Sequence, residues 1–375
     1  MEGAIPRESI ALVTLGCKRN PYSVSMPTVL DPYPFLLAPG LLLDVRSPAE
    51  YAQAHIPGAI SFPLFSNEER AIVGTCYKQH GRDAAVELGL QIVGPQLASF
   101  VQQAKQLTRD RTLRLHCWRG GMRSGSMAWL LEMAGFQVFL LDKGYKGFRQ
   151  WVRTVLAAAK RVLILGGMTG SGKTAVLHAL ARQGEQILDL EALANHRGSS
   201  YGNLGLPPQP STEHFENLIA VEWMKFDPAR PVWIEAESRM VGTCRIPDEV
   251  FCLMRHAPMI QLNRSRAERV AILLEVYGSA SPADLIAATD RITRRIGGQH
   301  AKAAIEHITG NNLAAAIEIV LNYYDKTYWY DVQKRGVAVY PIDAEQRSDT
   351  EIATLLIAKA RELEQFSDLR DVVNV

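Results

Sequence analysis

Short apolar runs that alternate with helix-forming stretches dominate the first 150 residues. Residues 41–45 predict a buried strand, and Ser47-Pro48-Ala49-Glu50 predicts a helix start with a capping residue, a first-turn proline and an early acid. A second apolar run, residues 112–116, leads through a glycine-rich turn into helical spacing at 124–134, and residues 137–141 predict another strand. Strands that alternate with helices predict a parallel sheet covered on both faces.

The same alternation restarts at residue 161, where an apolar run feeds a glycine cluster and then a helical stretch. From about residue 267 the pattern becomes helical and rich in Ala, Ile and Leu. The predicted fold is α/β: a parallel-sheet domain, then a second α/β domain with a helical C-terminal part. The expected parts are a tail outside the core at 1–27, the first domain at 28–158, the second α/β domain at 159–262, and a mainly helical part at 263–375.

Composition narrows the function classes only modestly. The chain has 47% hydrophobic and 21% charged residues, as in ordinary globular proteins, and its net charge of +2 leaves any nucleic acid to local patches. The five cysteines are scattered and include no C-x-x-C pair, which disfavours a disulfide framework or a zinc knuckle. Residues 10–16 are apolar but too short to span a bilayer. We therefore expect a cytoplasmic protein with no membrane partner.

Cys117 stands at the end of a predicted strand, before two glycines and a helix start. Backbone N–H groups in such a turn converge on the sulfur, and the helix N-terminus favours the thiolate. We expect Cys117 to be a catalytic nucleophile; an inert buried cysteine is the alternative. An oxyanion would lie in a cradle made by Arg119, Gly120, Gly121, Arg123 and Ser124.

Two motifs precede this loop in the sequence. Residues 43–46 (Leu-Asp-Val-Arg) with Glu50-Tyr51, and residues 55–60 (His-Ile-Pro-Gly-Ala-Ile), resemble the framing motifs of rhodanese domains in order and spacing. In that family the cysteine carries a persulfide or its selenium analogue. The loop also satisfies the H-C-x-x-G-x-x-R-[ST] pattern of cysteine phosphatases, so a rhodanese-fold phosphatase fused to a nucleotide-binding P-loop domain stays open.

Residues 167–174 match the phosphate-binding pattern G-x-x-x-x-G-K-[ST] in full, between a predicted strand and a predicted helix. Its glycines let backbone N–H groups wrap a diphosphate, its lysine adds a positive charge, and its threonine can reach a bound Mg²⁺. The expected diphosphate-binding residues are Gly167, Gly170, Ser171, Gly172, Lys173 and Thr174. Glutamates replace the commoner aspartate after the neighbouring strand, so the sequence assigns no certain metal ligand.

A polar, glycine-rich stretch at residues 189–202 predicts a substrate loop rather than core. With Gln209-Pro210, residues 215–217 and residues 237–239, it resembles the bacterial tRNA 2-selenouridine synthases, which join a rhodanese domain to a P-loop domain in this order. The resemblance covers about residues 28 to 335. The substrate or metal neighbours that it indicates are Glu191, His196, Arg197, Glu235, Glu237 and Arg239.

The resemblance implies a transferase, a tRNA selenotransferase and geranyltransferase. It would replace sulfur by selenium at the wobble 2-thiouridine of tRNA, with selenophosphate and geranyl diphosphate as co-substrates. It implies no tightly bound cofactor, Mg²⁺ as an option at the P-loop, and selenophosphate synthetase as a candidate partner besides tRNA. A phosphatase and a non-catalytic P-loop regulator remain the alternatives from other classes.

The C-terminal part offers basic and aromatic side chains for tRNA, although such residues are more often solvated faces or core. The basic candidates are Arg264, Arg266, Arg269, Arg291, Arg294, Arg295 and Lys302, and the aromatic ones are Tyr323, Tyr324, Tyr328, Trp329 and Tyr330 near Lys334. Both reactive loops follow strands of parallel sheets, whose carboxyl ends bind ligands. We therefore expect Cys117 and Lys173 to open toward a common cleft.

Overall fold

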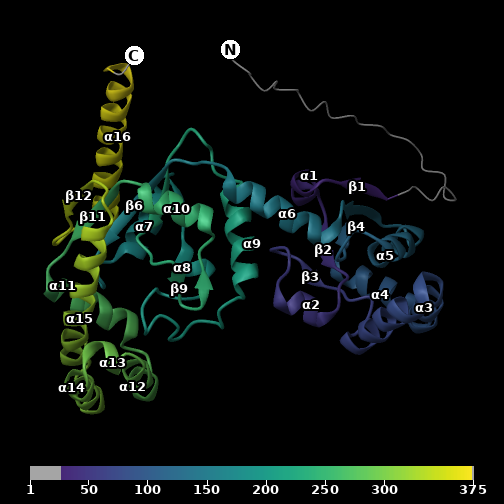
Figure 1. Ribbon diagram of the computed structural model, residues 1–375, viewed down its shortest axis with the longest axis horizontal. Helices are drawn as coiled ribbons and strands as arrows, with labels where there is room; N and C mark the ends of the chain where they lie inside the picture. Colours follow the sequence, from purple (N-terminus) through teal and green to yellow (C-terminus); the bar gives the residue numbers. More distant parts are fainter. Residues whose placement is uncertain (1–26, 374–375) are drawn as a thin grey trace.

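The computed structural model describes residues 27–373, with side chains described as far as Leu363. Two α/β units lie side by side, and helix α6 (Gly144–Ala157) leads from one to the other (Figure 1). The tail expected at 1–27 lies, apart from Pro27, outside the described residues.

The first unit is a five-stranded parallel sheet with the order β1-β5-β4-β2-β3. Its strands are β1 (Thr28–Leu30), β2 (Leu41–Asp44), β3 (Ile60–Ser61), β4 (Thr112–His116) and β5 (Gln137–Leu141). Its shorter helices are α1 (Pro32–Leu37), α2 (Pro48–Gln53) and α5 (Met122–Met133). In the register of β2 and β4, Leu43 lies opposite Leu115, and both side chains are fully buried. Leu42 and Leu43, whose side chains point to opposite faces of the sheet, are both buried, so the predicted strand Leu-Leu-Leu-Asp lies inside the sheet between β4 and β3 with both faces covered.

A helical segment is inserted between β3 and β4. It comprises α3 (Asn67–Val93), the short helix η1 (Gly94–Gln96) and α4 (Leu97–Leu107), and a glycine with positive φ, Gly81 (86°), breaks α3. Within the described residues, Asn67–Leu107 is one segment that could cross a membrane by length and composition. A single segment of this kind supports a membrane span only weakly, and α4 packs its buried Phe100 into the core of the first unit.

The second unit is a parallel sheet with the order β12-β11-β6-β8-β7. Its strands are β6 (Val162–Gly167), β7 (Gln186–Leu188), β8 (Val232–Glu235), β11 (Met259–Asn263) and β12 (Val339–Asp343), and β9 (Met240–Val241) and β10 (Cys244–Arg245) form a separate hairpin. The helices around it are α7 (Lys173–Arg182), α8 (Leu190–Leu193), α9 (Thr212–Trp223), α10 (Asp248–His256) and α16 (Asp349–Val373).

The boundary expected at residues 262/263 does not separate two structural units. Strand β12 pairs along its whole length with β11, and α16 packs on α7, so the chain returns to the P-loop sheet after its helical stretch. What lies between is a lobe with its own apolar core, formed by α11 (Arg266–Tyr277), α12 (Pro282–Arg291), α13 (Thr293–Ile296), α14 (Gly298–Thr309) and α15 (Leu313–Lys334). Figure 1 shows this lobe below the sheet.

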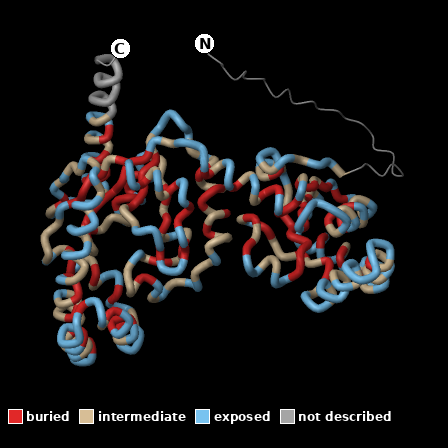
Figure 2. Tube along the Cα trace, viewed as in Figure 1, coloured by how far each residue is buried: buried red, intermediate tan, exposed pale blue. Residues whose placement is uncertain are grey.

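The two units share a buried interface along α6 and α9 (Figure 2). At the start of both helices, the Tyr145 hydroxyl donates to Glu213 over 2.7 Å, and at their ends the Trp223 indole donates to the Ala158 carbonyl over 3.3 Å. The helices therefore run in the same sense, inclined to each other (Figure 1). Each begins at the carboxyl edge of its own sheet, because α6 follows β5 and α9 lies between β7 and β8. The carboxyl edges of the two sheets consequently face the same end of the interface.

Candidate active sites

Cys117 directly follows β4, and its side chain is 3% exposed. Burial raises the pKa of this thiol, but the Ser124 hydroxyl at 3.2 Å, two backbone N–H groups and the charge of Arg123 lower the pKa further than burial raises it. The net pKa lies below the usual thiol value. The loop therefore favours a thiolate, the form of cysteine that acts as a nucleophile.

The predicted oxyanion cradle surrounds this sulfur. Gly120 has a φ of 65°, and a Cβ there would lie 2.9 Å from the Leu141 carbonyl oxygen, so only glycine lets the loop approach the start of α6. Gly121 precedes α5, the Ser124 hydroxyl faces the sulfur, and Arg119 is exposed. Arg123 is not free, because its guanidinium donates to Glu50 over 2.9 Å.

Sequence reasoning missed the buried polar layer beneath the cysteine loop. Arg46 is 1% exposed, pairs with Asp44 at 2.6 Å and lies 3.9 Å from the Tyr145 ring centre. His116 is fully buried beside Asp44, and burial lowers its pKa to about 4, so its ring is neutral. The motif Leu-Asp-Val-Arg contains two of these residues, but their spacing alone did not assign them to the support of the cysteine loop.

The phosphate loop joins β6 to α7. Its glycines have left-handed or extended positive φ angles, 152° at Gly167, 82° at Gly170 and 80° at Gly172. The Lys173 ammonium donates to the Gly167 carbonyl over 3.2 Å, and the Ser171 hydroxyl is buried with no hydrogen-bond partner among the described residues. Ammonium, hydroxyl and backbone N–H groups together form a donor-rich site that suits a diphosphate.

A buried ion pair braces this loop from outside. The Arg269 guanidinium donates to the Thr169 carbonyl at 3.1 Å and to both carboxylate oxygens of Asp325 at 2.7 Å. Arg269 is 3% exposed, so it is not available to tRNA, contrary to the expectation for the basic helix. The sequence could not distinguish it from Arg266, which lies on the same helix and is far more exposed.

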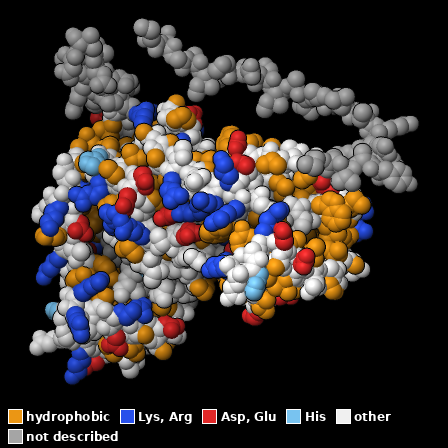
Figure 3. Space-filling model, turned by 45° about the vertical axis from the view of Figure 1, so that its right-hand side comes forward, with side chains coloured by type: hydrophobic (Ala, Val, Ile, Leu, Met, Phe, Trp, Pro, Cys, Tyr) orange, Lys and Arg blue, Asp and Glu red, His pale blue; other side chains and the backbone are white. Residues whose placement is uncertain are grey.

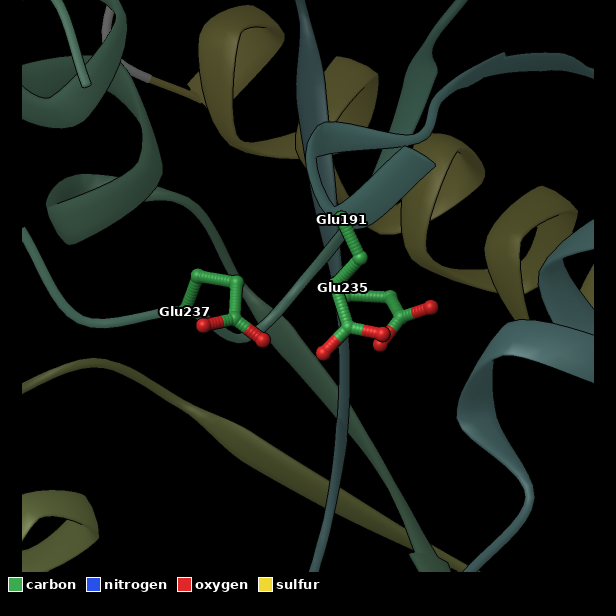
Figure 4. Close-up of side chains that lie close together, drawn as sticks. All are labelled: Glu191, Glu235 and Glu237. Carbon is green, nitrogen blue, oxygen red and sulfur yellow. The ribbon is translucent and has the colours of Figure 1, made fainter. Parts of the chain in front are cut away.

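The carboxylates of Glu191, Glu235 and Glu237 point toward one another beside the phosphate loop (Figure 4). Their closest oxygens lie within 4.8 Å of one another, and the Thr174 hydroxyl donates to Glu191 over 3.3 Å. Burial, then like charge from a neighbouring glutamate, raises the pKa values to about 8 for Glu191 and Glu235 and about 7 for Glu237. One Glu235 oxygen is buried with no hydrogen-bond partner among the described side chains. This donor set fits a hard divalent cation.

The other expected substrate neighbours divide into two groups. Arg197 donates to the Leu204 carbonyl over 2.8 Å and lines the pocket at the phosphate loop with the three glutamates. His196 is 8% exposed and packs against Gly202, and its pKa is lowered by burial and then by nearby arginines. Arg239 pairs with Asp248 and lines an adjacent pocket instead.

Comparison with known proteins decides the family. Residues 160–356 match the family model of the tRNA 2-selenouridine synthase AAA domain, and residues 36–150 match that of the rhodanese-like domain. Proteins named tRNA 2-selenouridine synthase from Marinobacter nauticus and Pseudomonas fluorescens are 35% and 34% identical over 332 and 331 residues. Each alignment covers 79% of this chain and 89% of the relative. The chain belongs to the tRNA 2-selenouridine synthase family.

Family membership confirms the fold class and does not favour the cysteine phosphatase alternative. A third relative of that name, from Nitrosomonas europaea, is 37% identical over 249 residues, 64% of each chain. Both reactive loops, Cys117 and the phosphate loop, lie inside the matched domains.

The pocket at the phosphate loop is the largest of three adjoining hollows in the described part of the second unit. Its volume is about 560 Å³, and all of its lining residues lie between Gly167 and Asp331. On one side it adjoins a hollow lined by Arg239, Arg255, Lys334 and Arg335 together with Phe251 and Tyr328. On another side it adjoins a narrow apolar slot. Figure 3 shows Lys and Arg side chains gathered over the central part of one face of the molecule.

Proposed function

We propose that this chain acts in the cytoplasm as a tRNA-modifying transferase that replaces sulfur by selenium at a wobble 2-thiouridine. Its co-substrates would be geranyl diphosphate and selenophosphate, with no tightly bound cofactor. One observation carries the proposal: a single chain of this family contains both a buried cysteine with a lowered pKa and a donor-rich phosphate loop beside three carboxylates.

The first step would occur at the phosphate loop. The 2-thio sulfur attacks the first carbon of the geranyl group, an S–C bond forms, and the C–O bond to the diphosphate breaks. The diphosphate leaves with that electron pair, and the loop's N–H groups and Lys173 stabilise the developing charge. Glu191, Glu235 and Glu237 would hold Mg²⁺, a hard cation that neutralises diphosphate oxygens when bound.

The second step would need selenium at Cys117. S-alkylation converts a poorly leaving thiocarbonyl sulfur into a thiol leaving group. The cradle of Arg119, Gly120, Gly121, Arg123 and Ser124 would bind selenophosphate, and the Cys117 thiolate would attack its phosphorus, so that an S–P bond forms and the P–Se bond breaks. The released selenide then forms the Se–C bond at C2 as the geranyl thiol departs. Water hydrolyses the S–P bond, releases phosphate and restores Cys117. Selenophosphate synthetase is the natural partner to deliver so reactive a donor.

The common sense in which α6 and α9 run supports the use of one substrate by both loops. Cys117 lies beside the start of α6, where the Tyr145 backbone N–H donates to the Cys117 carbonyl over 2.8 Å, and Tyr145 in turn contacts Glu213 at the start of α9. Ser211 and Thr212 at that helix start lie beside Gln53 and Arg245. The two carboxyl edges therefore face the same end, as a shared wobble base requires, although a continuous cleft between them stays a prediction.

The basic hollow beside the P-loop pocket is the proposed path for the anticodon backbone. Arg239, Lys334 and Tyr328 line it, and the ammonium of Lys334 lies 4.0 Å from the Tyr330 ring centre. Basic groups that alternate with aromatic rings suit single-stranded RNA, because they contact phosphates and stack on unpaired bases. Arg239 would act there rather than at the diphosphate, since Asp248 and Phe251 hold it on that side.

The test uses a synthetic anticodon stem-loop RNA with 2-thiouridine, geranyl diphosphate and selenophosphate, followed by mass spectrometry of the nucleosides. The wild-type chain should yield 2-selenouridine. Lys173→Ala should lose S-geranylation but convert most of a pre-made S-geranyl RNA, whereas Cys117→Ser should accumulate S-geranyl RNA. Equal loss of both reactions in either variant would contradict the assignment of one reaction to each loop. If the wild-type chain, but not Cys117→Ser, releases phosphate from aryl phosphates, the cysteine phosphatase alternative is favoured.

A further inference from the structure

The apolar slot beside the phosphate loop lies between four helices and the loop at 197–205. Its lining is almost wholly aliphatic and aromatic, with Leu273 and Tyr277 from α11, Leu285 from α12, Ile308 from α14, and Ala316, Ile317, Val320 and Leu321 from α15. The slot and the P-loop pocket share part of their walls. The shared residues are Thr169, Ser199, Leu273, Tyr277 and Tyr324. One ligand can therefore occupy both spaces.

The polar atoms on these walls are already bonded within the protein. The Tyr324 hydroxyl accepts from the Ser200 backbone N–H over 3.1 Å, and the Tyr201 hydroxyl lies 2.8 Å from the Thr289 hydroxyl. The Tyr277 hydroxyl lies 3.4 Å from the Ser199 hydroxyl. A ligand in the slot consequently meets ring faces and methyl groups. A purine or ribose placed there would leave its polar atoms without partners.

We infer that the slot binds the end of the hydrocarbon chain of an isoprenyl diphosphate whose diphosphate lies on the phosphate loop. This inference rests on the proposed function and adds residues that would select chain length. The slot itself measures about 40 Å³, room for about three waters. It therefore takes only the chain's far end, and the nearer carbons lie against Leu273 and Tyr277 on the shared wall.

Helix α15 offers substitutions that narrow and widen the slot without touching the phosphate loop. Ala316 is 2% exposed and lines the slot, so Ala316→Leu should fill it. Ile317 also lines the slot, and Ile317→Ala should lengthen it. Ile319, equally half-buried on the same helix, does not line the slot, so Ile319→Ala is the matched control.

The experiment measures binding by calorimetry in the absence of tRNA, so that no transfer occurs. Its ligands are inorganic diphosphate and the dimethylallyl, geranyl and farnesyl diphosphates. Each buried methylene is worth about fourfold in affinity, so geranyl diphosphate should bind at least tenfold more tightly than inorganic diphosphate. Ala316→Leu should remove roughly tenfold of the geranyl affinity and leave inorganic diphosphate unchanged. Ile317→Ala should raise farnesyl relative to geranyl affinity, whereas Ile319→Ala should not.

Failure of the inference and failure of the proposed function give different results. If all three alkyl diphosphates bind no more tightly than inorganic diphosphate, or if both α15 variants behave like Ile319→Ala, the slot is only a packing defect and the inference is wrong. ATP binding tighter than geranyl diphosphate would also overturn it. If the chain-length effects appear but no S-geranyl RNA forms, the assignment of the slot is correct and the proposed reaction is wrong. Unfolding of Ala316→Leu leaves Ile317→Ala as the deciding variant.

Discussion

The brace between Arg269, Asp325 and the Thr169 carbonyl should be worth far more than the exposed arginine pair next to it. Arg269 is 4% exposed and Asp325 is 19% exposed at the side chain. Arg266 lies on the same helix, pairs with the same aspartate at 3.5 Å and is 35% exposed. Arg266 also donates to Glu318 over 2.8 Å and to Asn322 over 2.9 Å. The two arginines therefore share a partner and are both multiply bonded but differ in burial, which makes Arg266→Met the control for Arg269→Met.

The magnitudes follow from that difference in burial. Removal of one partner of a buried, hydrogen-bonded ion pair costs about 3–5 kcal/mol of unfolding free energy, and the partial exposure of Asp325 favours the lower end. An exposed pair contributes about 0–1 kcal/mol. A domain of this size changes its melting temperature by about 2–4 °C per kcal/mol. Arg269→Met should therefore lower the melting temperature by roughly 6–12 °C and Arg266→Met by less than about 4 °C.

Loss of the brace should also weaken the binding of diphosphate to the phosphate loop. The Arg269 guanidinium fixes the backbone of the phosphate loop at Thr169, and a hydrogen bond from a charged donor is worth about 1.5–3 kcal/mol. Inorganic diphosphate should bind at least about tenfold more weakly to Arg269→Met than to wild type at a temperature where both are folded. Calorimetric melting and titration measure both effects. Equal melting shifts in the two arginine variants would refute the reasoning.

Two further predictions concern titrating groups. Ser124→Ala removes the hydroxyl that donates to the Cys117 sulfur, so the pH midpoint of Cys117 alkylation by iodoacetamide should rise; an unchanged midpoint would mean that the loop N–H groups alone set the pKa. The pKa of Glu235 is raised from 4.5 to about 8 in the folded chain. As pH rises from about 4.5 to 8, the carboxyl of Glu235 is ionised in the unfolded chain but still protonated in the folded one, so the free energy of unfolding falls. Glu235→Gln should therefore reduce the fall in melting temperature between pH 5 and pH 8. If the melting temperatures of variant and wild type fall equally over this range, Glu235 does not have the raised pKa.

The sequence predicted the parts of this fold that local signals encode. The strands before both reactive loops are short, apolar and followed by glycines, so their identity follows from a few neighbouring residues. Strand β12 was missed because it is only half-buried and contains Pro341, and the chain reaches it after a long helical stretch. Without that strand, the P-loop domain was expected to end at residue 262, whereas its sheet continues to Asp343.

The support around each site was harder to predict because it comes from distant positions. Asp325 lies 56 residues from Arg269, and the spacing gives no sign that the two meet across the phosphate loop. Likewise the sequence offers Tyr324 as a core or RNA-stacking residue, yet its hydroxyl bonds within the protein and its ring lines the slot. Sequence patterns located the cysteine loop and the phosphate loop, whereas burial and pairing had to come from the structure.

The interface between the two units bears directly on the cysteine loop. Tyr145 bonds to Glu213 and Asn217 of α9 across this interface, and its ring lies under Arg46, which pairs with Asp44 beside His116. The loop that carries the sulfur is thus attached through one buried tyrosine to the helix that begins at the edge of the P-loop sheet. Because close-packed groups transmit small displacements rather than absorb them, the position of the P-loop unit constrains the cysteine loop. A fusion in which either unit could rotate freely would lose this constraint, and the buried contacts between α6 and α9 remove that freedom.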